Sequence, residues 1–120
     1  MRICDTRAGN PSNLAGSTPQ CNTQPLGPGT TSQVNVSFLA GVPSNATAVV
    51  VNLTGVAPSA AGFLTVFSGA TQPTTSDLNQ TPGAVGANLV VATINANGTI
   101  SIFTSAGTTI VHVDVLGWYP

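Results

Sequence analysis

Few side chains in this sequence could take part in acid, base or nucleophilic chemistry. The 120 residues contain two arginines, three aspartates and one histidine, and neither lysine nor glutamate occurs. His112 and Asp114, with one of the many serines, would superficially supply the base, orienter and nucleophile of acyl transfer. Residues two apart on a strand project in parallel about 6 to 7 Å apart, too far for the aspartate to hold the imidazole. Because the chain also lacks a Gly-x-Ser-x-Gly nucleophile elbow, we expect no catalytic residues here.

The carboxylates are equally limited, since Asp5, Asp77 and Asp114 would have to supply any acid and base for glycoside cleavage. Asp5 and Arg7 lie two apart and point to one face of an expected strand. A buried charge is tolerated when it is paired, so we expect Arg7 or Arg2 to lie opposite Asp114 and tie the first strand to the last. Carboxylates held by arginine lose proton affinity and make poor general acids at neutral pH. The sequence therefore predicts a structural ion pair among Asp5, Arg7 and Asp114, with a ligand cleft or unpaired surface charges as alternatives.

Few side chains in the sequence could form a metal or ligand site. One histidine and two cysteines cannot furnish the three or four ligands of zinc, and Asp77 with Asn79 would make only a weak calcium site. We expect no metal and no cofactor. Trp118 and Tyr119 could stack on a sugar ring that Asp77 and Asn79 hydrogen-bond, or they could simply close one end of the fold.

The overall composition excludes several classes of protein. Charged residues make up 4% of the chain, against roughly 25% in an average soluble domain. A net charge of −1 offers no phosphate-neutralising patch, so we expect no nucleic-acid partner. No apolar run reaches the ~18 residues of a membrane-spanning helix, so we expect no membrane insertion. With 42% hydrophobic residues, the chain should fold as one domain over residues 1–120.

Cys4 and Cys21 bracket a segment rich in Gly, Pro, Ser and Asn that has no periodicity of its own. A disulfide across this span would contribute about 3 kcal/mol by the loop-entropy model. Disulfides persist in oxidising compartments, so the bridge predicts an extracellular or cell-surface protein, and the alternative is two unrelated thiols. The first residues lack the layout of a signal peptide, so we expect a piece processed from a longer exported chain.

Short runs rich in Val, Ile, Thr and Phe alternate with Gly, Pro, Asn and Ser clusters, a spacing typical of sandwiches and barrels. We expect an all-β, antiparallel β-sandwich of about seven to eight strands, jelly-roll or immunoglobulin-like, with one disulfide. The expected strands are residues 2–5, 32–39, 48–53, 62–67, 89–94, 99–104 and 109–116.

Three local patterns refine this expectation. Asn97-Gly98 lies between two expected strands and tolerates positive φ, which predicts a tight antiparallel hairpin. The continuous apolar run at residues 49–51 indicates a central strand. The long polar stretch at residues 68–86 has little strand character and is either a functional loop or a structured crossover between the two sheets.

The expected strands are apolar, Thr-rich and nearly free of charge, so no lysine guards an edge. Unguarded edges favour side-by-side association, which makes self-assembly into oligomers or a filament a further expectation.

Five segments also match a known pattern as an ordered set. They are the Asp-Thr-Arg start within residues 2–7, residues 41–54, residues 61–66, Ser-Asp-Leu-Asn at 76–79 and Val-Asp-Val-Leu-Gly-Trp-Tyr at 113–119. Together they resemble an uncharacterised accessory β-sandwich domain that recurs in exported actinobacterial proteins, often beside hydrolase, peptidase or repeat domains. The resemblance implies a secreted module without known catalytic residues. Trp118 departs from the family pattern, which more often ends Gly-Tyr-Tyr or Gly-Tyr-Phe.

We therefore expect a protein that is not an enzyme. The leading hypothesis is a structural or adhesive extracellular module whose partner is a further copy of itself. The alternative is a carbohydrate-binding module whose partner is a cell-surface or environmental glycan.

Overall fold

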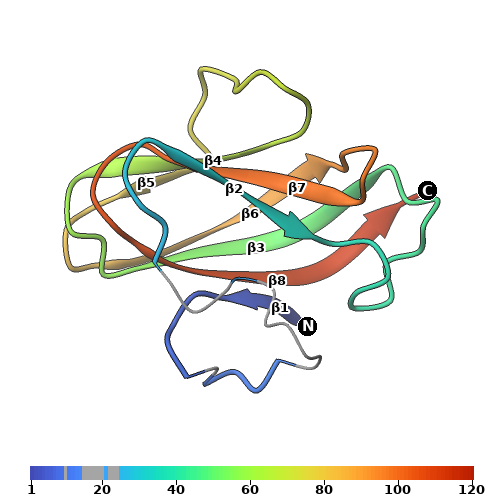
Figure 1. Ribbon diagram of the computed structural model, residues 1–120, viewed down its shortest axis with the longest axis horizontal. Coiled ribbons are helices and arrows are strands. Elements are labelled where there is room, and N and C mark those ends of the chain that lie inside the picture. Colours follow the sequence, from blue (N-terminus) through green and yellow to red (C-terminus); the bar gives the residue numbers. More distant parts are fainter. Residues whose placement is uncertain (10, 15–20, 22–24) are drawn as a thin grey trace.

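A computed structural model describes residues 1–9, 11–14, 21 and 25–120, and within this part of the chain every regular element is a β-strand. Eight strands form two antiparallel sheets that pack face to face (Figure 1). The strands are β1 (Arg2–Asp5), β2 (Thr30–Asn35), β3 (Ala48–Val56), β4 (Gly62–Phe67), β5 (Leu78–Gln80), β6 (Val85–Thr93), β7 (Thr99–Thr104) and β8 (Ile110–Tyr119). The described residues include no helix able to cross a membrane.

The strand order identifies the sandwich as a jelly roll. The first sheet has the order β1-β8-β3-β6 and the second β2-β7-β4-β5. Strand pairs β1·β8, β2·β7, β3·β6 and β4·β5 are all antiparallel, so the chain resembles one long hairpin wrapped into two sheets. The tip of this hairpin is the connection of residues 68–77 between β4 and β5, which projects from the sandwich (Figure 1).

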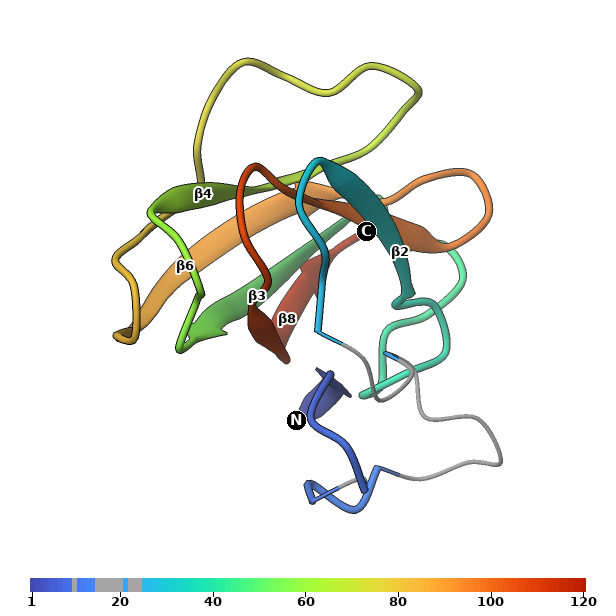
Figure 2. The same cartoon turned by 60° about the vertical axis from the view of Figure 1, so that its left-hand side comes forward.

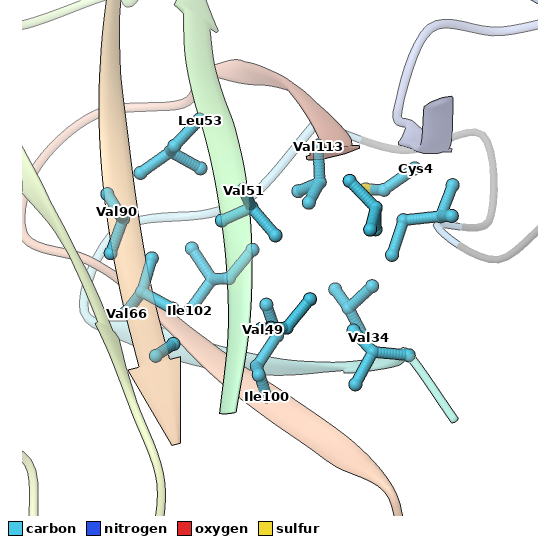
Figure 3. Close-up of a cluster of buried hydrophobic side chains, with 14 of the residues drawn as sticks. Cys4, Val34, Val49, Val51, Leu53, Val66, Val90, Ile100, Ile102 and Val113 are labelled. Carbon is cyan, nitrogen blue, oxygen red and sulfur yellow. The ribbon is translucent and has the colours of Figure 1, made fainter. Parts of the chain in front are cut away.

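The core lies between the two sheets and follows the period-two alternation of the strands. In β3, Val49, Val51 and Leu53 point inward and are fully buried, while the residues between them are half-buried. They meet Ile100 and Ile102 of β7 across the sandwich (Figure 3). As predicted, β3 is an interior strand, with β8 on one side and β6 on the other.

The predicted disulfide between Cys4 and Cys21 is confirmed, with 5.2 Å between the Cα atoms. Cys4 is buried in the core, and the bridge joins Cys21 to β1. The antiparallel β-sandwich predicted from the sequence is therefore present with its single disulfide.

One predicted strand is displaced along the sequence. The expected strand at residues 32–39 is found as Thr30–Asn35, because the chain turns immediately afterwards. Phe38 and Ala40 have positive φ values of 66° and 50°, which end an extended strand. The apolar residues after Asn35 suggested a longer strand, but Val36 and Val42 instead anchor this turn in the core.

The predicted hairpin at Asn97-Gly98 is wrong, although the turn exists. Gly98 has a φ of 80° and its amide donates to the carbonyl of Asn95 at 2.8 Å. The strands on either side lie in different sheets, since β6 pairs with β3 and β7 pairs with β2 and β4. Turn chemistry sets the local reversal of the chain, whereas the jelly-roll wrap determines which strands become neighbours.

The stretch at residues 68–86 contains more regular structure than its composition indicates. It includes all of β5 and the start of β6, so the prediction of little strand character is wrong there. Because β5 belongs to the second sheet and β6 to the first, the segment is a structured crossover, the second of the two predicted alternatives. β5 has only three residues and no β-branched side chain, so the β-propensity of its residues did not indicate a strand.

Candidate functional site

Four of the five charged side chains in the sequence gather on the outward side of β1 and β8. The register places Arg2 opposite Asp114, and the guanidinium donates two hydrogen bonds to the carboxylate, Nε to Oδ1 at 3.0 Å and Nη2 to Oδ2 at 3.2 Å. About a third of the Arg2 side chain remains exposed. This pair links the first and last strands.

Asp5 forms the buried half of the same cluster. Its side chain is completely buried and accepts hydrogen bonds from the Arg7 guanidinium, with Nη2 to Oδ2 at 2.7 Å, and from the Arg7 backbone amide at 3.1 Å. The Ser12 hydroxyl donates to the same carboxylate and accepts from Arg2 at 3.2 Å. The Arg7 guanidinium is the main reason that the pKa of Asp5 lies far below its usual range, against the opposing effect of burial.

His112 lies beside this cluster on β8 and is largely buried. Its Nε2 is 3.4 Å from Oδ1 of Asp5, close enough for electrostatic contact, but the geometry is not that of a hydrogen bond. Burial lowers the pKa of His112, and the positive charge of Arg2 lowers it further. The imidazole is therefore neutral at physiological pH.

The arrangement cannot perform acid–base catalysis of the usual kind. Asp5 is held ionised by Arg7 and is closed to solvent, so it cannot deliver a proton at neutral pH. Ser12 donates to Asp5 and not to the imidazole, so no base is positioned to activate its hydroxyl. The sequence did not indicate Ser12, since it lies in a polar loop with no motif around it. The cluster instead links Arg2, Asp5, Arg7 and Ser12 to one another and to β8.

The structure places Asp77 and Asn79, the proposed polar ligand-binding residues, in internal hydrogen bonds. The Asp77 carboxylate accepts from the backbone amide of Val66 at 2.7 Å, and its own amide donates to Leu64 at 2.9 Å. Asn79 accepts from Ser76 at 2.8 Å. Asp77 thus extends the pairing between β4 and β5 and holds the base of the 68–77 connection.

Trp118 and Tyr119, the proposed aromatic pair, lie elsewhere. They end β8 opposite Val49 and Ala48, and they are 44% and 54% exposed. Trp118 lies over the turn at Gly41, where a Cβ would come within 3.9 Å of its ring. Adjacent strand residues face opposite sides of a sheet, so the two rings do not form one stacking surface.

The two halves of that proposed site are not brought together. Asn88, which donates to the carbonyl of Asp77 at 2.8 Å, lies opposite Leu53, whereas Trp118 lies opposite Val49. The four-residue offset along β3 corresponds to about 13 Å, and Asp77 adjoins the second sheet while Trp118 belongs to the first.

A cavity of about 360 Å³ opens beside the disulfide between the two sheets. Its described lining includes Cys4, Thr6, Leu26, Val34 and Ile102. Apart from the two bridged cysteines, none of the described lining residues has a side chain that titrates near neutral pH, so the cavity offers no acid or base to a ligand. In the part of the chain that the structure describes, no cluster of three His, Cys, Asp or Glu residues could hold a metal ion.

The most exposed apolar surface on a strand is the outward side of β3 and β6, with part of β8. Val85, Leu89 and Val91 of β6 are 68%, 64% and 56% exposed. Directly opposite residues share a face of the sheet, so Val50 and Val56 of β3 lie beside them. We define the outer apolar face as Val50, Val56, Val85, Ala87, Leu89, Val91 and Ile110. Figure 2 shows β6, β3 and β8 side by side, with β6 at the margin of the sheet.

Comparison with known proteins adds no assignment to this geometry. No protein-family model matches the chain, and no curated protein matches it significantly.

Proposed function

We propose that the chain is a non-catalytic structural or adhesive module of a secreted or cell-surface protein, and that it makes its contacts through the outer apolar face. One observation carries this proposal: every charged side chain has a partner within the chain, while exposed aliphatic side chains collect on one side of the first sheet. A surface of this kind is suited to burying apolar area against another protein surface.

An extracellular setting is part of the proposal. The disulfide is compatible with an oxidising compartment, and a surface dominated by Thr, Ser and Asn does not depend on charge for its solubility. The resemblance of residues 2–7, 76–79 and 113–119 to an accessory domain of exported actinobacterial proteins supports the same setting.

Glycan binding is the second candidate, and one observation favours it. Trp118 lies over the turn that carries Phe38, which is 78% exposed, so two accessible aromatic rings adjoin this turn. Exposed aromatic rings can stack on sugars. The candidate has less support than the first because Asp77 and Asn79, the polar groups expected to complete it, are engaged elsewhere in the fold.

Sedimentation velocity over a range of concentrations, combined with binding to a panel of cell-wall polysaccharides, separates the two candidates. The first predicts association that Leu89→Lys abolishes and that Thr31→Lys, on the exposed edge strand of the other sheet, leaves intact. Neither variant should bind sugar. A strict monomer that binds a polysaccharide saturably, and that loses binding in Trp118→Ala, would overturn the first candidate in favour of the second.

A further inference from the structure

β6 presents a row of unpaired backbone groups on one side. The Ile94 amide donates to Thr47 and the Ala57 amide donates to Ala84, both at 2.9 Å, so the even-numbered residues of β6 direct their backbone groups toward β3. Alternate residues of an antiparallel strand point their N–H and C=O groups to opposite sides. Residues 85, 87, 89, 91 and 93 therefore point theirs away from β3, where no described strand pairs with them.

This edge lacks the devices that normally block strand addition. β6 has nine residues, contains neither charge nor proline, and pairs with β3 without a bulge. The other three edge strands differ: β1 has four residues and two charges, β5 has three residues, and β2 is polar. Neighbouring segments contact β6 on its inward side, where Leu78 lies against Gly86, and at its C-terminal end, where the hydroxyls of Ser68 and Thr93 form a hydrogen bond. The outward side chains at the edge remain exposed.

We infer that β6 is the site at which a second copy of this chain adds, strand to strand and antiparallel, across a two-fold axis at Leu89. The inference rests on the self-association in the proposed function, and it names a second copy as the partner and the β6 edge of the outer apolar face as the place where that copy attaches. A two-fold at Leu89 sets Leu89 against its own copy, Ala87 against Val91 and Val85 against Thr93. All five edge-facing residues then find partners, in about ten hydrogen bonds. A two-fold at Ala87 or Val91 would leave part of the edge unpaired.

Self-pairing of this strand carries no electrostatic cost. A strand that meets its own copy brings like residues close together, so a charge near the centre would meet the same charge of the partner. β6 has none, and the paired cluster of Arg2, Asp5, Arg7 and Asp114 lies at β1 and β8, which β3 separates from β6. The pairing also joins the outer apolar faces of two copies into one continuous surface.

The small area of the β6–β6 contact predicts a weak dimer. A single nine-residue strand pair is about 30 Å long and buries less than the roughly 1,200 Å² typical of a stable interface. We therefore expect a reversible dimer whose population rises with protein concentration.

Distances between nitroxide labels test this register directly. The native disulfide leaves a newly introduced cysteine as the one reactive thiol. Label on Leu89→Cys should show strong dipolar broadening in concentrated solution, because the two labels meet at the axis. Label on Val85→Cys, four residues from the axis, should give a distance distribution centred at about 27 Å between strand positions. Label on Thr31→Cys should show neither signal.

Ala87→Pro provides an edge-specific disruption. The Ala87 amide faces the free edge, so proline removes a donor from the dimer contact and none from the pairing with β3. We expect the dimer to be lost while the outer apolar face stays in place. If this variant does not fold, the label distances decide the question alone.

Two results separate failure of this inference from failure of the proposed function. If the chain associates in a way that Leu89→Lys abolishes, yet Leu89→Cys shows no broadening and Ala87→Pro still associates, the strand pairing is wrong and the outer apolar face stands. If the wild-type chain stays monomeric at high concentration, the pairing is wrong, and the proposed function loses self-association as its means of contact.

Discussion

At the scale of single residues, the charge chemistry of this chain converges on Asp5. Its buried carboxylate accepts from Arg7 and Ser12 and lies 3.4 Å from the His112 imidazole. Asp114, by contrast, pairs with Arg2 at a partly exposed position. We therefore expect Asp5 and Asp114 to contribute differently to stability, because the Asp5 carboxylate is completely buried whereas that of Asp114 is partly exposed to water.

Asp5→Asn should lower the free energy of unfolding by about 2 to 3 kcal/mol, since the Asp5 side chain is completely buried and the neutral amide loses the charge-assisted hydrogen bonds from Arg7 and Ser12. Asp114→Asn is the matched control and should cost about 1 kcal/mol or less, because its pair is screened by water. Urea unfolding of both variants measures the difference. Equal losses in the two variants would show that Asp5 is not the buried anchor of the cluster.

Acid should destabilise the fold in two steps. The pKa of His112 is lowered in the folded state, so the unfolded chain takes up this proton first and stability falls as the pH drops below about 6.5. The pKa of Asp5 is lowered too, so its contribution is present above about 4 and is lost as the pH falls further. Thermal unfolding from pH 8 to pH 3 follows both steps. His112→Gln should remove the upper step alone, and an unchanged upper step would contradict its assignment.

The sequence indicated that the charged residues pair within the chain, but it did not indicate which residues pair or what Asp77 contacts. The scarcity of charge made internal pairing among Asp5, Arg7 and Asp114, with Arg7 or Arg2 opposite Asp114, a reasonable hypothesis, because so few partners exist. The choice of partner could not be read from the sequence, since the β1–β8 register that sets Arg2 opposite Asp114 contains a bulge. The role of Asp77 was hidden as well, because it depends on β4 lying beside it.

At the scale of elements, turn and strand chemistry fixes local structure and leaves strand partners open. The expected strands at residues 2–5, 62–67 and 99–104 have the observed bounds, because each is a short run enclosed by turn residues. Pairing follows the jelly-roll wrap, which separates β6 from β7 although they are consecutive. Pairing between strands that lie far apart in the sequence cannot be read from the residue pattern of either strand. For this reason the hairpin at Asn97-Gly98 was predicted wrongly.

Gly98→Ala tests the turn between the sheets. Gly98 has a φ of 80°, and a Cβ there would come 2.8 Å from the Cβ of Ser37. Gly69→Ala is the control, because Gly69 has a φ of 84° and open space around it. Both variants carry the backbone strain, about 1 kcal/mol, and Gly98→Ala should lose about 1 to 3 kcal/mol more from the steric clash. Equal melting temperatures of the Gly98→Ala and Gly69→Ala variants would mean that the turn at Gly98 does not pack against Ser37.

At the scale of the whole molecule, the fold separates two kinds of surface. Charged groups are paired internally: the cluster around Asp5 holds Arg7 and Ser12 against β1, and the disulfide joins Cys21 to the same strand. The edge and outer face of β6 carry aliphatic side chains and no charge. Composition and periodicity predicted the sandwich and its disulfide. They also indicated unguarded edges, but the identity of the exposed edge depends on sheet order, which the sequence does not display.

Amide hydrogen exchange of two neighbouring residues tests the central claim most directly. The Val90 amide points toward β3, whereas the Leu89 amide points to the free edge. We predict that Val90 exchanges slowly at every protein concentration, and that Leu89 exchanges rapidly in dilute solution and slowly in concentrated solution. A Leu89 exchange rate that stays rapid and independent of concentration would contradict the account.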